Sequence, residues 1–215
     1  SCGVGLVVSV DGSASRKVVE HGIDALRAVW HRGAVDADGK TGDGAGIHVQ
    51  IPVKFFYDQV RRTGHEPDAT KLIAVGQVFL PRTDFGAQEA CRTIVETEVL
   101  RMGHYIYGWR HVPSDISVLG EKALATRPEI EQILIRCENG ADAEQFEREL
   151  YIIRRRIEKA ATKAGIQGMY LCSLSCRSII YKGMMLAEQV ATFYPDLMDE
   201  RFESSFAIYH QRYST

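Results

Sequence analysis

Short β-rich runs that follow one another in pairs, with helical segments between the pairs, restrict the fold of this chain most. Met169–Leu174 and Ser178–Lys182 are separated only by the polar junction 175–177, which suits an antiparallel pair. Tyr105–Trp109 and Gln132–Cys137 are two further strands, separated by an irregular link. A doubly wound fold would instead alternate single strands with helices. We therefore predict an α+β fold with antiparallel sheets.

The other predicted elements follow from apolar periodicity and turn residues. Ser15 can cap the first helix, and Asp142 with Gln145 forms a capping box at the start of the clearest helix. Strands are expected at 4–10, 47–51, 72–80 and 206–213. Helices are expected at 15–33, 55–62, 87–103 and 142–165, with a helical stretch after 183.

Composition excludes several classes of protein. The 215 residues fit one large domain or two small ones, and 45% hydrophobic content is enough for a sizeable core. A net charge of -2 argues against a nucleic-acid partner, and no apolar run is long enough to span a membrane. Five scattered cysteines are not a disulfide framework. Because no signal sequence opens the chain, a cytoplasmic location is expected.

Cys2 is the first candidate for chemistry. Its thiol lies near the chain start beside Gly3 and Gly5, where a substrate would have free access. A cysteine at a free terminus also carries its own base, since an α-amino group titrates at about 7.7–8.0. The alternative is a small buried apolar residue that starts a strand. Position alone favours the alternative.

Two arginines and a cysteine pair are further candidates. Arg32, after the first helix, could pair with a carboxylate or simply be a cation at a helix C-terminus. Arg212, at the end of the last strand, could grip a carboxylate bidentately or form a surface salt bridge. Cys172 and Cys176 have no flanking histidine and are weak evidence for zinc. No metal site is predicted.

The glycine-rich segment 42–46 is interpreted as a tight turn. It lacks the third glycine and the following helix that a dinucleotide-binding loop requires. Asp36 and Asp38 begin like a calcium loop, but Lys40 and Ile47 stand where oxygen ligands are needed.

Five ordered motifs together carry a resemblance that covers essentially the whole chain. They are Cys2-Gly3-Val4-Gly5, His31-Arg32-Gly33, Thr41-Gly42-Asp43-Gly44-Ala45-Gly46, Tyr181-Lys182-Gly183-Met184 and His210-Gln211-Arg212-Tyr213-Ser214-Thr215. The chain resembles the N-terminal class II glutamine amidotransferase domain of the glutamate synthase large subunit. The resemblance implies an N-terminal nucleophile hydrolase fold, a four-layer αββα sandwich of two antiparallel sheets between helix layers.

The resemblance also implies an activity and roles for residues. Cys2 would attack the side-chain amide of L-glutamine to give a γ-glutamyl thioester, with its own amine moving protons. Arg212 matches the family arginine that binds the substrate α-carboxylate. Tyr213 and Thr215 would help to shape that pocket, and Arg32 would have a supporting role.

In the complete enzyme the ammonia would pass through a tunnel to a flavin domain and react with 2-oxoglutarate. The resulting imine would be reduced there to glutamate. FMN and an iron–sulfur cluster are expected in those later domains, and no cofactor is expected in this one. The expected partners are the remaining domains of the subunit and either a small NADPH-oxidising subunit or ferredoxin.

Two departures from the family pattern affect what this chain is expected to do. Ser1 precedes Cys2, so the nitrogen of Cys2 is an amide and not a base. The sequence also stops at Thr215, before the Asn-Gly pair that supplies the oxyanion hole in the family, and Asn139-Gly140 is not accepted as its substitute. We therefore expect residues 1–215 to be one amidotransferase domain, truncated on its C-terminal side and inactive as given. The alternatives are another class II amidotransferase and a catalytically silent docking or regulatory module.

Overall fold

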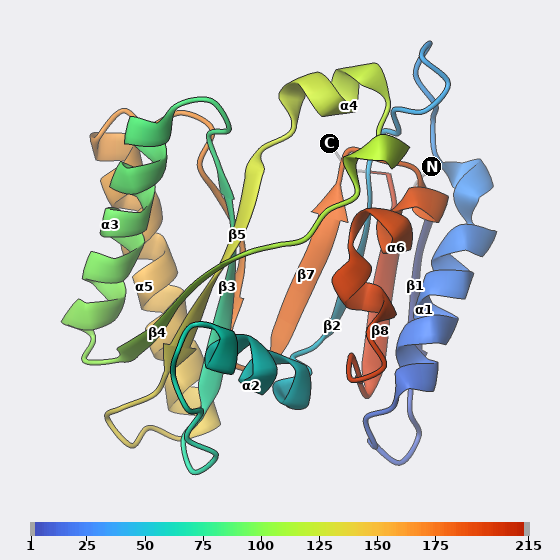
Figure 1. Cartoon of the computed structure of the whole chain (residues 1–215). Helices are drawn as coiled ribbons and strands as arrows, with labels where there is room; N and C mark the ends of the chain where they lie inside the picture. Colours follow the sequence, from blue (N-terminus) through green and yellow to red (C-terminus); the bar gives the residue numbers. More distant parts are fainter. Residues whose placement is uncertain (1–2, 213–215) are drawn as a thin grey trace. The chain divides into compact units, whose positions relative to one another are not determined.

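The structure, a computed structural model, describes residues 3–212 and contains two compact units (Figure 1). Within the described residues, the first unit comprises 3–54, 112–127 and 180–212, and the second comprises 55–111 and 128–179. Each unit contains one four-stranded antiparallel sheet and its own helices. The α+β class and the two antiparallel sheets predicted from the sequence are therefore confirmed.

The first unit is built on a sheet with the strand order β1-β8-β2-β7. Its strands are β1 (Gly3–Val8), β2 (Ala45–Gln50), β7 (Ser178–Gly183) and β8 (Phe206–Gln211). β8 runs antiparallel to both β1 and β2, so the beginnings of β1 and β2 lie beside the end of β8. Helix α1 (Arg16–Ala28) packs on these three strands. Gly22 permits this close packing, since a Cβ there would lie 2.5 Å from the Cβ of Ala207.

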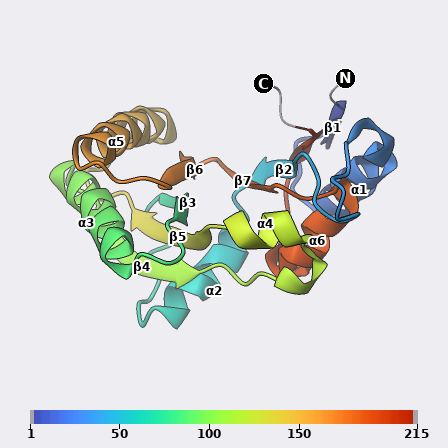
Figure 2. The same cartoon turned by 90° about the horizontal axis from the view of Figure 1, so that it is seen from above.

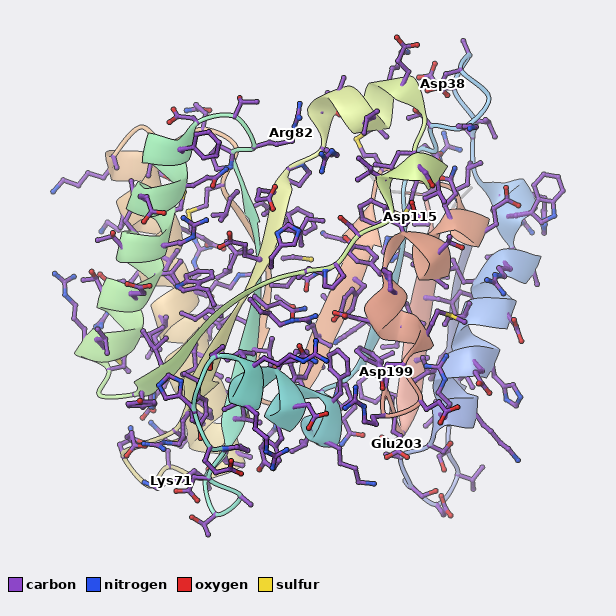
Figure 3. All side chains as sticks on the ribbon, in the orientation of Figure 1. Asp38, Lys71, Arg82, Asp115, Asp199 and Glu203 are labelled. Carbon is purple, nitrogen blue, oxygen red and sulfur yellow. The ribbon has the colours of Figure 1, made fainter. Side chains whose placement is uncertain are left out.

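Short helices complete the first unit. They are α4 (Glu121–Thr126), α6 (Val190–Phe193) and the 3₁₀ helices η1 (Trp30–Arg32), η2 (Ile116–Val118), η3 (Ala187–Gln189) and η4 (Pro195–Met198). Asp38, labelled in Figure 3, links the loop before β2 to the start of α4. Its carboxylate accepts hydrogen bonds from the N–H of Thr41 at 2.7 Å and of Lys122 at 3.4 Å.

The second unit is built on a sheet with the strand order β4-β5-β3-β6. Its strands are β3 (Ile73–Leu80), β4 (Tyr105–His111), β5 (Glu129–Arg136) and β6 (Tyr170–Ser175). All three neighbouring pairs are antiparallel, with a register shift after Gln77 in β3 and another before Gly108 in β4. Gly108 has a φ of 139°, a conformation that glycine adopts without strain.

Three helices belong largely to the second unit. They are α2 (Val53–Arg62), α3 (Phe85–Arg101) and α5 (Ala143–Lys163). Figure 2 shows α3 and α5 side by side on one face of the second sheet. Phe146, Leu150, Ile153 and Ile157 of α5 pack into a core with apolar residues of β3, β5 and α3. Their spacing of four, three and four residues places them on one face of the helix.

Several details differ from the predictions. The strands β6 and β7, expected to form an antiparallel pair, belong to different sheets, because a short polar junction does not fix which strand a segment pairs with. The Asp142 side chain accepts from the N–H of Gln145 at 2.8 Å as expected, but the Gln145 side chain donates to Glu149, so only half of the capping box forms. Ser15 occupies the N-cap of α1 without a side-chain hydrogen bond. The first helix ends at Ala28 and continues as η1. Helix α4 was not predicted, because six residues in a proline-flanked link carry too little periodicity.

None of the helices in the described part of the chain combines the length and the apolar character that a membrane span requires.

A buried histidine in the second unit makes stability depend on pH. The His104 side chain is fully buried, with Nε2 3.1 Å from a carboxylate oxygen of Glu149 and its ring against Phe146. Burial lowers the pKa of His104 despite the facing charges of Glu149 and Glu138. Burial raises the pKa of Glu149, but hydrogen bonds from Gln145 and Asn139 and the interaction with His104 outweigh this, so its pKa is lowered overall.

We expect the free energy of unfolding to decrease as the pH falls from 7 to 5. A histidine with a lowered folded-state pKa binds its proton more readily when unfolded, so its contribution is complete above about 6.5 and is lost below that value. His104→Asn should make this slope shallower in chemical denaturation at several pH values. The control is His21→Gln, which changes an exposed histidine of α1. The assignment would be contradicted if this control made the slope of unfolding free energy against pH shallower while His104→Asn left it unchanged.

Candidate active site

One end of the first sheet brings together three chain segments that are far apart in the sequence. Gln211, the last residue of β8, pairs in register with Gly3 of β1 on one side and with Ala45 of β2 on the other. Since both partners stand at the start of their strands, the segment before β1, the segment before β2 and the segment after β8 meet here. We call this the β8 end of the sheet.

Arg32 lies at this end, beside the start of β1. It closes η1, which follows α1 directly. A Cβ built on Gly3 would lie 3.3 Å from Cβ and Cγ of Arg32. The fold therefore places the stem of the Arg32 side chain against the residue that follows Cys2 in the sequence.

Arg212 lies at the same end in an unusual conformation. Its φ is 82°, in the left-handed region that non-glycine residues occupy at a cost of about 1–3 kcal/mol. Its N–H donates to the carbonyl oxygen of Gly44 at 2.6 Å. Its Nε lies 3.0 Å from Oδ2 of Asp43, an ion pair without the alignment of a hydrogen bond. The Arg212 side chain is 45% exposed and keeps access to solvent.

The loop before β2 and the start of β2 itself require glycine for steric reasons. A Cβ on Gly42 would lie 2.4 Å from the backbone carbonyl of Met185. A Cβ on Gly46 would lie 2.6 Å from both the His210 ring and the Lys182 stem. These close approaches leave no room for side chains. Only residues 42–44 of the segment interpreted as a turn lie in the loop, and residues 45 and 46 already belong to β2.

His210 is the polar side chain next to the end of β8. It pairs in register with Val4 and Gly46. Burial, and then the positive charge of Lys182, lower the pKa of His210 below its ordinary value. The imidazole is therefore neutral at pH 7 and adds no charge to the two arginines at this end of the sheet.

Of the predicted site residues, the structure describes Arg32 and Arg212 and brings both to the β8 end. Cys2, Tyr213 and Thr215 lie outside the described residues. Sequence reasoning missed Asp43, the partner of Arg212, and Gln211, which is fully buried at the centre of this end. The available signals were a carboxylate between two glycines and a polar residue at an inward strand position.

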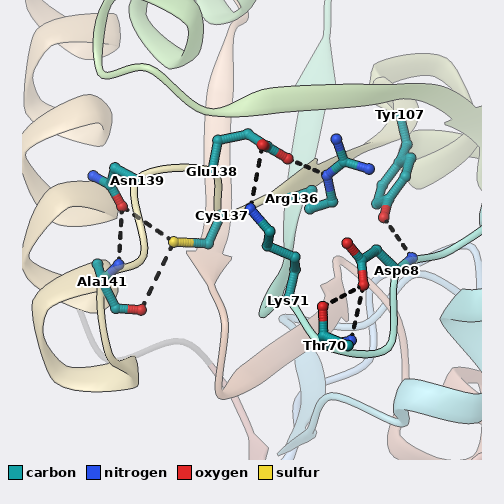
Figure 4. A network of polar contacts seen from close by, with 9 residues as sticks. All are labelled: Asp68, Thr70, Lys71, Tyr107, Arg136, Cys137, Glu138, Asn139 and Ala141. Atoms are coloured by element: carbon teal, nitrogen blue, oxygen red, sulfur yellow. Dashed lines mark hydrogen bonds and ion pairs between the residues drawn. The ribbon is translucent and has the colours of Figure 1, made fainter.

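The other candidates have structural roles in the described residues. The Asn139 side chain accepts from the N–H of Ala141 at 3.1 Å and from the thiol of Cys137, and donates to Glu149 at 3.0 Å (Figure 4 shows the first two contacts). Its amide is thus engaged in the turn before α5. Within residues 3–212, no three His, Cys, Asp or Glu side chains lie close enough to hold a metal ion.

Comparison with known proteins identifies the family. The sequence matches the class-II glutamine amidotransferases over residues 2–215. The chain belongs to this family. Members of the family are glutamine amidotransferases.

Similar proteins are glutamate synthases. The amidotransferase is 67% identical to the glutamate synthase [NADPH] large chain of Azospirillum brasilense, over 100% of this chain and 14% of that protein. It is 41% identical to the chloroplastic ferredoxin-dependent glutamate synthase of Spinacia oleracea and 40% identical to ferredoxin-dependent glutamate synthase 2 of Synechocystis, over 100% of this chain. It covers 13% and 14% of those two proteins, so it spans about one seventh of the length of these relatives.

Proposed function

We propose that this amidotransferase hydrolyses L-glutamine with Cys2 as the nucleophile and supplies ammonia for glutamate synthesis from 2-oxoglutarate. The observation that carries the proposal is the antiparallel ladder of β1 and β8. It brings the start of β1 beside Arg212, while Arg32 packs against Gly3. A nucleophile at residue 2 would then act beside a guanidinium, that of Arg212, which can hold a carboxylate substrate.

The proposed reaction has two stages. The Cys2 sulfur attacks the amide carbon of glutamine while the Cys2 amine accepts the thiol proton. The tetrahedral oxyanion collapses, the amine returns the proton to the leaving nitrogen, and ammonia departs from a γ-glutamyl thioester. Water then attacks the thioester with the amine as base, and glutamate and the free thiol are released.

The two arginines have different roles in this proposal. Arg212 holds the α-carboxylate of glutamine, which would share the guanidinium with Asp43. Arg32 supports the start of β1 from the side of η1. Tyr213 and Thr215 complete the pocket. Arg212 only binds the carboxylate in this proposal, and neither arginine transfers a proton.

The proposal for the whole protein rests on its relatives. FMN and an iron–sulfur cluster belong to later domains, with a small NADPH-oxidising subunit or ferredoxin as the electron donor. The 67% identity to an NADPH-named large chain, against 37–41% for ferredoxin-named proteins, supports NADPH. The cysteines of the described residues are free thiols, which accords with the proposed cytoplasmic location.

The function can be tested by trapping the nucleophile in the mature, full-length protein. A glutamine-like diazo ketone should form one covalent adduct, located at Cys2 by peptide mass spectrometry, and excess glutamine should slow its formation. Labelling elsewhere, or no labelling of protein with a free Cys2 amine, would overturn the proposal.

Protein that retains Ser1 is expected to hydrolyse glutamine at least about 100-fold more slowly than protein that begins at Cys2. Removal of a general base typically costs a factor of 10² to 10⁴, and an amide nitrogen cannot take the thiol proton. Ammonia release should be measured on both forms, with the N-terminus of each verified by intact mass and equal thermal unfolding as the control. Rapid hydrolysis by the Ser1 form would show that another group is the base.

A further inference from the structure

We propose that Gln211 is a positioning residue that holds Arg32 and Arg212 in place for substrate binding. The inference rests on the proposed function, because it concerns the same glutamine site. Gln211 has no assigned role in the proposed chemistry, yet its side chain contacts the loop that carries Arg32 and the loop that holds Arg212.

The backbone of Gln211 is held on both sides. It is the last residue of β8 and pairs with Gly3 in β1 and with Ala45 in β2. Its side chain is 0% exposed. Because water is excluded from this buried position, the polar side chain must form its hydrogen bonds with groups of the neighbouring loops.

The first of these loops carries Arg32. A Cβ built on Gly33 would lie 2.2 Å from Nε2 of Gln211 and 2.9 Å from its Cδ. The backbone of Gly33 therefore lies directly against the Gln211 amide. Because Arg32 is the preceding residue, the Gln211 amide supports the backbone from which the Arg32 stem reaches Gly3.

The second loop carries the partner of Arg212. Nε2 of Gln211 donates to the carbonyl oxygen of Gly44 at 3.3 Å. The same oxygen accepts from the N–H of Arg212 at 2.6 Å. Asp43, directly before Gly44, forms the ion pair with Arg212. One carbonyl thus joins the buried amide to the strained backbone of Arg212.

The contacts require an amide in particular. Nε2 supplies the donor for Gly44, and Oε1 has no hydrogen-bond donor among the described residues. A methionine would fill nearly the same volume without the donor. A glutamate would place a second acceptor against the Gly44 carbonyl. Both substitutions remove the link and leave the charges of Arg32 and Arg212 intact.

The test is Gln211→Met in the full-length protein with a mature Cys2. KM for glutamine should rise about tenfold, the effect of losing one neutral hydrogen bond, while kcat stays within about twofold. Gln50→Met is the matched control, because Gln50 lies at the other end of β2 and binds Ser205. This control should leave both constants unchanged.

A double-mutant cycle tests the contact with the Arg32 loop. Gly33→Ala should raise KM, since its methyl group displaces the Gln211 amide. In Gln211→Ala the space is vacated, so adding Gly33→Ala should cause no further rise in KM. Full additivity of the two effects would show that they act independently and would overturn the proposal.

Three outcomes separate this proposal from its alternatives. An unchanged KM in Gln211→Met overturns it. A lower kcat and a lower melting temperature with unchanged KM would show that Gln211 only stabilises the fold, and also overturns it. If the unmodified protein neither hydrolyses glutamine nor is labelled at Cys2, the proposed function itself fails.

Discussion

Replacing Cys2 by alanine in the mature, full-length protein is expected to reduce glutamine hydrolysis by at least about 10⁴-fold. Loss of a covalent nucleophile removes the thioester route altogether, and nucleophile deletions in comparable hydrolases cost factors of this order or more. The measurement is glutamate release from glutamine under saturating substrate. Thermal unfolding should be unchanged, because one sulfur atom at a chain start contributes little to the core.

The described cysteines provide the control for this experiment. Burial raises the pKa of the Cys91 and Cys137 thiols. Burial, together with the carboxylate of Glu147, raises the pKa of Cys176 to about 12. These thiols stay protonated at neutral pH and are poor nucleophiles. Cys176→Ala should therefore hydrolyse glutamine at the normal rate. A normal rate of glutamine hydrolysis in Cys2→Ala would show that Cys2 is not the nucleophile.

Arg212→Met is expected to raise KM for glutamine by about 10- to 100-fold, with a much smaller change in kcat. Loss of a hydrogen bond to a charged group costs about 1.5–3 kcal/mol, and the α-carboxylate is bound equally in the ground state and the transition state. Steady-state kinetics on the mature protein measure both constants. Removal of the guanidinium also leaves Asp43 without its ion-pair partner.

Arg201→Met is the matched control. Arg201 is 40% exposed against 45% for Arg212, and it forms an ion pair with Asp199 (labelled in Figure 3) just before β8. Its substitution removes a comparable guanidinium at the opposite end of the same strand and should leave KM unchanged. Equal effects from the two substitutions would assign the Arg212 effect to general charge or stability.

The sequence was sufficient for the elements whose pattern is long and regular. The core face of α5 follows directly from apolar spacing, and β6 and β7 were predicted as separate strands. Their expected pairing with one another was wrong, since β6 pairs with β3 and β7 belongs to the other sheet. Short elements could not be predicted in this way, because a helix such as α4, with only six residues between prolines, shows too little periodicity. At the start of α5, the Gln145 side chain bonds Glu149, one turn further along the same helix, and not the backbone of the N-cap.

The sequence likewise predicted only part of the candidate site. Arg32 and Arg212 were found from motifs, but the sequence left their ordinary interpretations open. Their position at one sheet end follows only from the ladder in which Gln211 pairs with Gly3 and Ala45. Asp43 became part of the site only because the left-handed backbone of Arg212 directs it toward the loop before β2.

By itself the sequence determined the fold class, the succession of strands and helices, and the residue types available for chemistry, because these depend on local periodicity and side-chain character. Only the tertiary structure decided which distant segments meet at the β8 end and which buried amide lies between them. Strand pairing joins residues over 160 positions apart, such as Ala45 and Gln211, and no local pattern encodes which strands will pair or in what register.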